Sequence, residues 1–306
     1  MRCFYHPDYY LPLPEGHPFP MEKFPEARRL LGAWAPEQVE VVHVEPASRA
    51  QLERVHTPAY LDSIRYGTLT PRERTKLGLP HHPRLLERSA LETAGTIAAA
   101  HAALAEGIAA NLAGGTHHAF ADRGEGYCVL NDVCVALADL WTRDPHLHAL
   151  VIDTDAHQGN GTAALLREEP RAFTYSIHVG RNYPSKKEPS DVDVPLNRWA
   201  PGHTYLDALR RTLPAAIERA DPDIAFWITG ADPHEDDRFG QMALTDAELA
   251  TRDRFVLASV RAHWIPLVVL YGGGYHRSGR TGELHAQSVA RSAKSEPSKV
   301  PTEGKI

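Results

Sequence analysis

Short apolar runs alternate with amphipathic or Ala-rich stretches along most of the chain. Strands are predicted at residues 39–44, 108–113, 148–153, 171–178, 223–229 and 266–270, and helices near 25–32 and at 48–53, 58–66, 89–106, 132–141, 204–220 and 245–263. Thr204 with Asp207, and Thr245 with Glu248, have the spacing of capping boxes at the starts of the last two helices. Because strands buried on both faces are nearly continuous apolar runs, this alternation predicts an α/β fold with a parallel sheet covered on both faces by helices.

The remaining segments are predicted to be loops and a tail. Residues 67–85 and 181–203 are rich in Pro, Gly and polar residues, so we interpret both as loops, and we expect the pair His81-His82 to be exposed near the rim of any site. No second core or linker is evident. We therefore expect one domain over residues 1–290, followed by a polar tail, 291–306, that is partly disordered.

Composition and charge narrow the function classes. The chain has 306 residues, of which 42% are hydrophobic and 24% charged, with a formal net charge of −6, which does not favour a nucleic-acid partner. No apolar run approaches the roughly 18 residues of a membrane span, and the first residues lack the apolar core of a signal peptide. Its three cysteines form no CxxC pair and no disulfide framework, so we expect a reducing, cytoplasmic location, and the Arg-rich, Lys-poor composition favours a bacterial source.

The main chemical candidate follows the predicted strand 148–153. Asp153, Asp155 and His157 occupy alternating positions, and side chains at such positions in a strand point the same way. Two carboxylates and an imidazole at a buried strand end are costly unless a cation neutralises them. Their spacing favours a divalent metal over an internal salt bridge at a capped strand end.

Polar residues also follow three other predicted strands. His117-His118, Asp232 and Tyr275 each come after an apolar run, and ligands of parallel sheets bind outside the carboxyl ends of strands. Asp155, His157 and Asp232 would leave a metal position open for water, as in catalytic zinc sites. His117 or His118 is then the candidate base, with Asp153 behind one imidazole. Tyr275 is the candidate donor to an oxyanion, and the set predicts metal-assisted hydrolysis of an amide.

Each motif has a local alternative when it is taken alone. The tandem histidines could belong to a helix-capping loop, and Asp232-Pro233 could only start a turn. The run Gly272–Gly274 could cradle a phosphate, although no Lys-Ser/Thr follows it. Cys128 and Cys134 are interpreted as small buried residues rather than ligands.

Taken together, the motifs resemble the histone deacetylase family, and in particular its class IV branch and bacterial deacetylase-like amidohydrolases. The resemblance covers residues 1–290 and follows the order of the family's motifs. The matching stretches are Tyr5-His-Pro-Asp8, Pro14-Glu-Gly-His17, Val55-His-Thr-Pro-Ala-Tyr60, Gly114-Gly-Thr-His-His118, Gly126-Tyr-Cys-Val-Leu-Asn-Asp132, Asp153-Thr-Asp-Ala-His-Gln-Gly-Asn-Gly161, Gly230-Ala-Asp-Pro-His-Glu-Asp-Asp237 and Gly272-Gly-Gly-Tyr275.

The resemblance implies an arginase/deacetylase fold with an eight-stranded parallel sheet, and a deacylase acting on acyl-lysine. It implies one catalytic Zn²⁺ held by Asp155, His157 and Asp232, with His118 as general base and later proton donor to the amine. His117, paired with Asp153, would orient the water, and Tyr275 would donate to the scissile carbonyl. A structural K⁺ is implied at Asp153, Asp155, His157, Ser176 and the Ile177 carbonyl, and tunnel walls are implied at Gly126, Tyr127, Tyr183 and Phe239.

The sequence departs from many family members at two places. His157 is followed by Gln158 where a second His is common, and Asn160 stands where an Asp often pairs with the general base. A neutral Asn should leave His118 less basic than a carboxylate would. Both departures fit the class IV branch.

Several functions stay open at this stage. The acyl group could be acetyl or a longer fatty acyl chain, and its carrier a protein, a polyamine or another small amine. A binuclear-manganese ureohydrolase would need further carboxylates, roughly one at Gly159, and is ranked low. A non-catalytic binding module would not need His117, His118 and Tyr275 together.

Overall fold

In a computed structural model, which describes residues 1–294, the chain forms one eight-stranded sheet in which every neighbouring pair is parallel. The strand order is β2-β1-β3-β8-β7-β4-β5-β6. The strands are β1 (Arg2–Phe4), β2 (Glu40–Val42), β3 (Ile108–Asn111), β4 (Ala149–Asp153), β5 (Ala172–Val179), β6 (Val192–Leu196), β7 (Ile224–Ile228) and β8 (Leu267–Leu270). The α/β class and the eight-stranded parallel sheet are confirmed.

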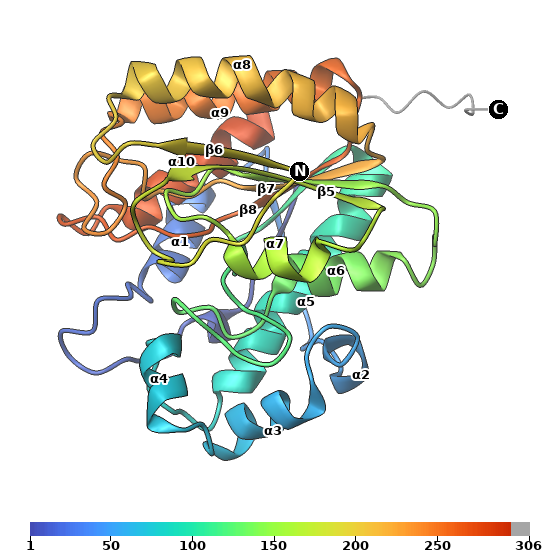
Figure 1. The fold of residues 1–306 in the computed structure, drawn as a ribbon, viewed down its shortest axis with the longest axis vertical. Helices are drawn as coiled ribbons and strands as arrows, with labels where there is room; N and C mark the ends of the chain where they lie inside the picture. Colours follow the sequence, from blue (N-terminus) through green and yellow to red (C-terminus); the bar gives the residue numbers. More distant parts are fainter. Residues whose placement is uncertain (295–306) are drawn as a thin grey trace.

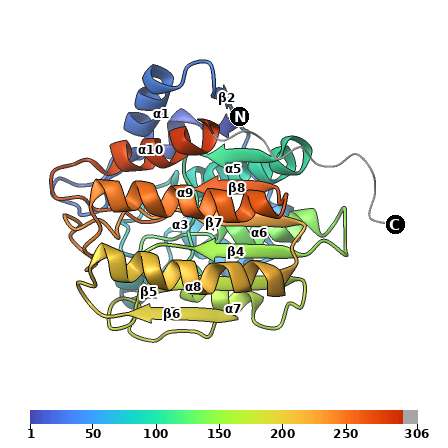
Figure 2. The same ribbon diagram turned by 90° about the horizontal axis from the view of Figure 1, so that it is seen from above.

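Helices cover both faces of this sheet. Helices α8, α9 and α10 lie over one face, and α5, α6 and α7 lie over the other, with α2, α3 and α4 beyond them (Figure 1). A view from above shows α8 and α9 running along the strands (Figure 2). The helices are α1 (Lys23–Trp34), α2 (Arg49–Leu52), α3 (Pro58–Tyr66), α4 (Pro71–Leu77), α5 (Leu85–Glu106), α6 (Asp132–Leu140), α7 (Asn160–Leu166), α8 (Gly202–Ala220), α9 (Asp246–Ala262) and α10 (Thr281–Lys294), with a 3₁₀ turn at Pro7–Tyr9.

The middle of the sheet forms the core. Every residue of β4, β7 and β8 is buried, which explains why their sequences are apolar without alternation. Each buried Leu, Ile or Val contributes roughly 1.5–3 kcal/mol relative to exposure. Strands β4, β7 and β8, which precede three parts of the site, are therefore held by burial on both faces of the sheet.

Two segments interpreted as loops contain regular structure, so those interpretations were wrong in part. Residues 71–77 form α4, in which Thr70 and Glu73 make a capping box at the start and Pro71 is the first helical residue. Gly78, in the left-handed conformation, caps its end. Residues 192–196 form β6, an edge strand with only half-buried and exposed residues. Proline at a helix start and polar residues on an edge strand are both permitted, so composition alone misled.

Other boundaries also differ from the prediction. Helix α9 begins with the Thr245–Glu248 capping box as predicted, but α8 begins after Pro201 without a side-chain cap, so a capping box at Thr204 was wrong. The elements β1, α7 and α10 were not predicted, because they are short or mostly polar. Residues 291–294 continue α10, and the rest of the predicted tail lies outside the described residues.

Within residues 1–294, no helix combines the length and the apolar character that a membrane span requires.

Candidate metal centre and active site

The candidate residues meet at one edge of the sheet. They follow β3, β8, β7 and β4, which are consecutive in the strand order and lie near its middle. Because parallel strands end at the same edge, the four connecting loops converge there. The separate strand ends recognised in the sequence therefore form one site.

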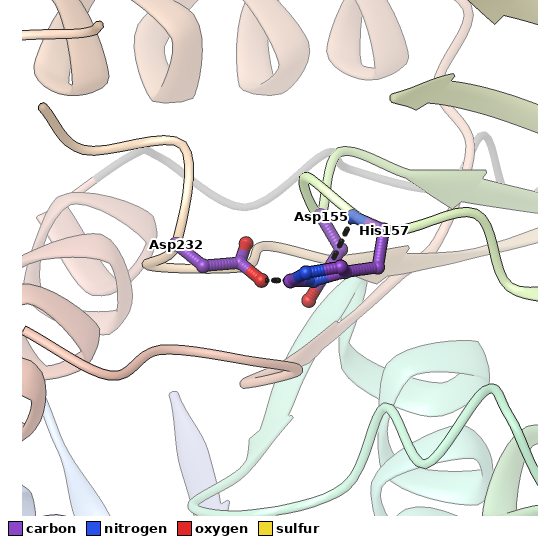
Figure 3. Close-up of side chains that lie close together, drawn as sticks. All are labelled: Asp155, His157 and Asp232. Carbon is purple, nitrogen blue, oxygen red and sulfur yellow. Dashed lines mark hydrogen bonds and ion pairs between the residues drawn. The ribbon is translucent and has the colours of Figure 1, made fainter. Parts of the chain in front are cut away.

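Asp155, His157 and Asp232 form a buried cluster that can hold a metal ion. Their potential ligand atoms all lie within 4.8 Å of one another, and all three residues are buried. His157 Nδ1 lies 2.7 Å from Asp232 Oδ2 and 3.2 Å from Asp155 Oδ1 (Figure 3). The residues predicted as ligands from two separate strand ends thus point at one another, and a buried cluster of this composition is suited to a divalent cation.

The orientation of the His157 ring is set by a contact on its far side. Its Nε2 lies 3.2 Å from the backbone carbonyl oxygen of Phe239, which can only accept, so Nε2 must carry the proton. Burial opposes protonation of the ring, but Asp232 and Asp155 outweigh it and raise the pKa of His157 well above its usual range. Nδ1 therefore also carries a proton, directed at the two carboxylates, and a bound metal ion would take the place of that proton. A hydrogen bond that fixes the tautomer in this way is typical of metal-binding histidines.

The two carboxylates of the cluster repel each other. Burial and the neighbouring Asp155 carboxylate raise the pKa of Asp232 to about 7. Backbone N–H groups stabilise both acids: Ala156 N–H donates to Asp232 at 2.9 Å and Gly273 N–H donates to Asp155 at 2.6 Å. A cation between the carboxylates would relieve the remaining repulsion.

The two neighbouring histidines lie in different electrostatic environments. His117 Nδ1 donates to Asp153 Oδ2 at 2.7 Å, and His118 Nδ1 donates to Asn160 Oδ1, also at 2.7 Å. Burial opposes protonation of His117, but Asp153 and Asp155 outweigh it and raise the pKa of His117 to about 9. Burial and the adjacent His117 instead hold the pKa of His118 well below its usual range. His118 is therefore the neutral imidazole, and His117 is the positively charged one.

The run Gly272–Gly274 allows the chain to pass close to the metal cluster. A Cβ at Gly273 would lie 2.6 Å from Asp232 Oδ2 and 2.8 Å from Asp155 Oδ2. Since Gly273 N–H already binds a carboxylate, this loop is unsuited to cradle a phosphate. The next residue, Tyr275, has its ring 5.0 Å from that of Phe239 and 5.8 Å from that of Tyr127. Burial raises the pKa of Tyr275 well above its usual value, so its phenol stays protonated.

Two cavities meet at this site. An outer chamber of about 310 Å³ is lined by residues that include all four predicted tunnel-wall residues, namely Gly126, Tyr127, Tyr183 and Phe239. An inner cavity of about 30 Å³ is lined by Asp155 and His157 of the cluster and also by Lys23, Arg88 and Glu92. His118, His157 and Tyr275 line both cavities, so the candidate chemistry lies where the two join.

Sequence reasoning missed several residues of these walls. Thr75 and Lys76 reach the outer chamber from α4, which was not predicted, and the carbonyl groups of Lys76 and Leu77 accept from Gly126 N–H and Tyr127 N–H. Lys23 is 3% exposed on α1, although lysine is rarely buried. No pattern in the sequence marks it. His81 is exposed and His82 half-buried, and neither lines the two cavities.

Gln158, which stands where many family members have a second histidine, forms hydrogen bonds of its own. Its side-chain amide donates to the Glu188 carbonyl at 2.6 Å and to Asp193 Oδ1 at 2.8 Å, and it accepts from Glu188 N–H at 3.0 Å. Gln158 therefore fastens the segment that carries Tyr183 to the metal loop. At Gly159, an added Cβ would lie 2.6 Å from Asp153 Oδ2, which leaves no room for the further carboxylate of a binuclear site.

The predicted K⁺ position remains a prediction. Asp153 and Ser176 are neighbours in the register of β4 and β5, and Asp155 N–H donates to Asp153 Oδ1 at 3.0 Å. The Ser176 hydroxyl lies 2.9 Å from His178 Nδ1. These oxygens suit a hard cation by their chemistry.

The chain is similar to known proteins in both sequence and structure. A family model described as histone deacetylase domain matches residues 17–290. An uncharacterized protein of Picosynechococcus sp. is 40% identical over 277 residues, which are 90% of this chain and 92% of that protein. Histone deacetylase 2 of Arabidopsis thaliana is 28% identical over 86% of this chain and 70% of its own length. A crystal structure of an HDAC homolog complexed with SAHA superposes with a TM-score of 0.77 at 22% identity, covering 96% of this chain and 82% of that one.

Proposed function

Because this chain belongs to the histone deacetylase domain family, we propose that it is a zinc-dependent deacylase that releases short acyl groups from the amine of lysine side chains. It is a hydrolase of this family with a buried Asp-His-Asp metal site. The observation that carries the finer proposal is the meeting of that site with His118 and Tyr275 at the junction of two cavities.

The donor set of Asp155, His157 and Asp232 fits zinc, since it offers two carboxylates and one imidazole and has an open side towards the cavities. When bound, a zinc ion supplies Lewis acidity, which activates a water and polarises an acyl carbonyl.

His118 is the residue suited to move the proton. Its Nδ1 is committed to Asn160, so Nε2 carries the lone pair, and His118 lines both cavities. In this role Nε2 takes a proton from the attacking water and then gives it to the departing amine. His117, paired with Asp153, stays cationic beside it and orients the water.

Tyr275 is the residue suited to stabilise the developing oxyanion. Its phenol stays protonated, and its ring lines both cavities, so a hydrogen bond to the acyl oxygen is available without a proton loss. Such donors typically contribute 10²–10³ in kcat.

The cavity sizes indicate which acyl group fits best. An extended lysine side chain suits the outer chamber of about 310 Å³, whose walls include three tyrosines and Phe239. The inner cavity of about 30 Å³ has room for little more than a methyl group or a few waters. We therefore favour acetyl over longer fatty acyl groups, with a lysine in a peptide or protein, or a small amine such as a polyamine, as its carrier.

Release of acetate from an acetyl-lysine peptide tests this proposal. The reaction should require zinc, stop with a chelator and return when zinc is restored. A parallel arm with an acetylated polyamine separates protein from small-amine substrates. Zinc-loaded protein that binds the peptide but releases no acetate from either substrate would identify a binding module instead.

A further inference from the structure

Asp237 is a buried acid outside the metal cluster. It is 1% exposed, and no Lys, Arg or His side chain forms an ion pair with it within residues 1–294. Its two carboxylate oxygens accept only backbone N–H groups. A carboxylate that is buried without an ion-pair partner is costly, so an apolar residue would be expected at this position unless the carboxylate had a use.

The three N–H groups that Asp237 binds belong to two different loops. Asp237 Oδ2 accepts from Tyr275 N–H at 2.6 Å. Asp237 Oδ1 accepts from Phe239 N–H at 2.8 Å and from Gly240 N–H at 2.9 Å. One side chain therefore joins the turn after Asp232 to the loop that carries the Tyr275 phenol.

Further backbone contacts make these two loops one unit. Arg238 N–H donates to the Tyr275 carbonyl at 3.2 Å, and Arg277 N–H donates to the Asp236 carbonyl at 3.0 Å. Tyr275 has little freedom to shift unless the 236–240 turn shifts with it.

The same turn reaches two of the metal-cluster residues. The Phe239 carbonyl accepts from His157 Nε2–H at 3.2 Å, and this contact fixes the ring of that residue. A Cβ at Gly240 would lie 1.7 Å from the Asp232 carbonyl oxygen, so the turn is pressed against the backbone of a second cluster residue. The geometry of the turn is thus shared by the metal cluster and by Tyr275.

We propose that Asp237 is a positioning residue for the reaction, which fixes the Tyr275 phenol relative to the metal cluster through the 236–240 turn. This inference rests on the proposed deacylase function. A carboxylate suits the role because its two oxygens accept three N–H bonds at once, whereas an amide has one acceptor oxygen and an NH₂ group that faces other N–H groups.

The test is a double-mutant cycle with Asp237→Asn and Tyr275→Phe in the zinc-loaded full-length protein. Asp237→Asn should lower kcat for acetyl-lysine peptide about 10- to 100-fold and change KM less than about 3-fold, because an interaction made in the transition state is lost. In the Tyr275→Phe background the same change should lower kcat less than about 3-fold, since the phenol that Asp237 positions is already gone. An equal loss in both backgrounds, or no loss in either, overturns the proposal.

Two further variants keep the test decisive. Asp207→Asn neutralises an exposed acid on α8 whose side chain pairs with Arg210, and should retain activity within about 3-fold. If Asp237→Asn does not fold, Asp237→Glu completes the cycle, because it keeps the charge but displaces the oxygens by one methylene. A fully active Asp237→Glu variant would show that only the charge matters and would overturn the proposal.

Zinc affinity gives a readout that does not depend on activity. Because the 236–240 turn holds His157, Asp237→Asn should weaken zinc binding about 10-fold, as is typical when a contact behind a ligand is lost. An unchanged zinc dissociation constant overturns the link to His157. If the wild-type protein binds zinc but hydrolyses no acyl-lysine, the proposed function fails, while this measurement still tests the positioning role.

Discussion

Asn160 Oδ1 lies 2.7 Å from His118 Nδ1 and accepts its proton in a hydrogen bond. An amide oxygen in this place fixes the tautomer of His118 but adds no negative charge behind it. The Asp153 carboxylate, in contrast, places a negative charge behind His117. The two adjacent imidazoles consequently differ in protonation. His118 is therefore the neutral imidazole of the pair, and His117 is the protonated one.

Replacing Asn160 by Asp should move the acidic limb of the pH–rate profile. A carboxylate behind His118 raises its pKa, and His118 must be unprotonated to act as a base, so activity should begin to fall at a higher pH than in the wild type. The measurement is kcat/KM between pH 5 and 9. Asn197→Asp adds the same charge at an exposed position and should leave the limb in place. An unshifted limb in Asn160→Asp would contradict the base assignment.

Replacing Asp232 by Asn should remove the metal. One of two carboxylates in the cluster becomes neutral, and the affinity for zinc should fall at least about 100-fold. Metal content per chain after dialysis, measured by elemental analysis, checks this. Asp221→Asn is a matched control, because Asp221 ends α8 at a φ of 37°, where asparagine is well tolerated. Full zinc retention in Asp232→Asn would place the metal elsewhere.

Shortening Lys23 should change the acyl preference. Lys23 Nζ donates to the Gly272 carbonyl at 3.0 Å, and Lys23 lines the inner cavity. Lys23→Ala should therefore favour longer acyl chains, with the butyryl-to-acetyl ratio of kcat/KM rising about 10-fold. Lys23→Met removes the charge but keeps the volume, so it should retain the acetyl preference. A wild-type protein that already prefers long acyl chains would show that the inner cavity does not set their length.

The stability of the fold should fall in mild acid because of His56. Burial lowers the pKa of His56 to about 4. Its Nδ1–H donates to the Phe120 carbonyl at 3.0 Å, and its Nε2 accepts from Asn131 N–H at 2.9 Å, so a second proton would face a donor. The unfolded chain binds that proton below about pH 6.5, and the folded chain does not.

The free energy of unfolding should thus decrease as pH falls from 6.5 towards 4, and His56 should account for about 2 kcal/mol between pH 7 and pH 5. Denaturant unfolding at both pH values measures the difference. His56→Gln lacks the titrating group and should show a smaller decrease, whatever its stability at pH 7. Burial also lowers the pKa of His178 to about 4, so His178 should still cause part of the decrease in unfolding free energy in this variant. An identical pH dependence in both proteins would contradict the assignment.

The sequence was sufficient to predict site residues where their positions along one strand determine the geometry. Asp155 and His157 are two residues apart after a fully buried strand, so their common direction followed from strand geometry. Asp232 joined them because parallel strands end together. The buried position of Lys23 depends instead on the packing of α1 against residues far along the chain, and no local pattern encodes it. Helix α4 was hidden because its sequence, with Pro71 and many charges, is equally compatible with a loop.

The metal cluster and part of the wall of the outer chamber come from different parts of the fold. The loops after the adjacent strands β3, β8, β7 and β4 carry the metal cluster, the two neighbouring histidines and Tyr275. Tyr183 lies between β5 and the edge strand β6, and Thr75 and Lys76 lie on a helix outside the sheet. Insertions or exchanges in these outer segments can therefore change the walls of the outer chamber without altering the metal cluster. This arrangement makes the protein a suitable scaffold for engineering selectivity, with α4 and the 181–191 segment as the parts to diversify.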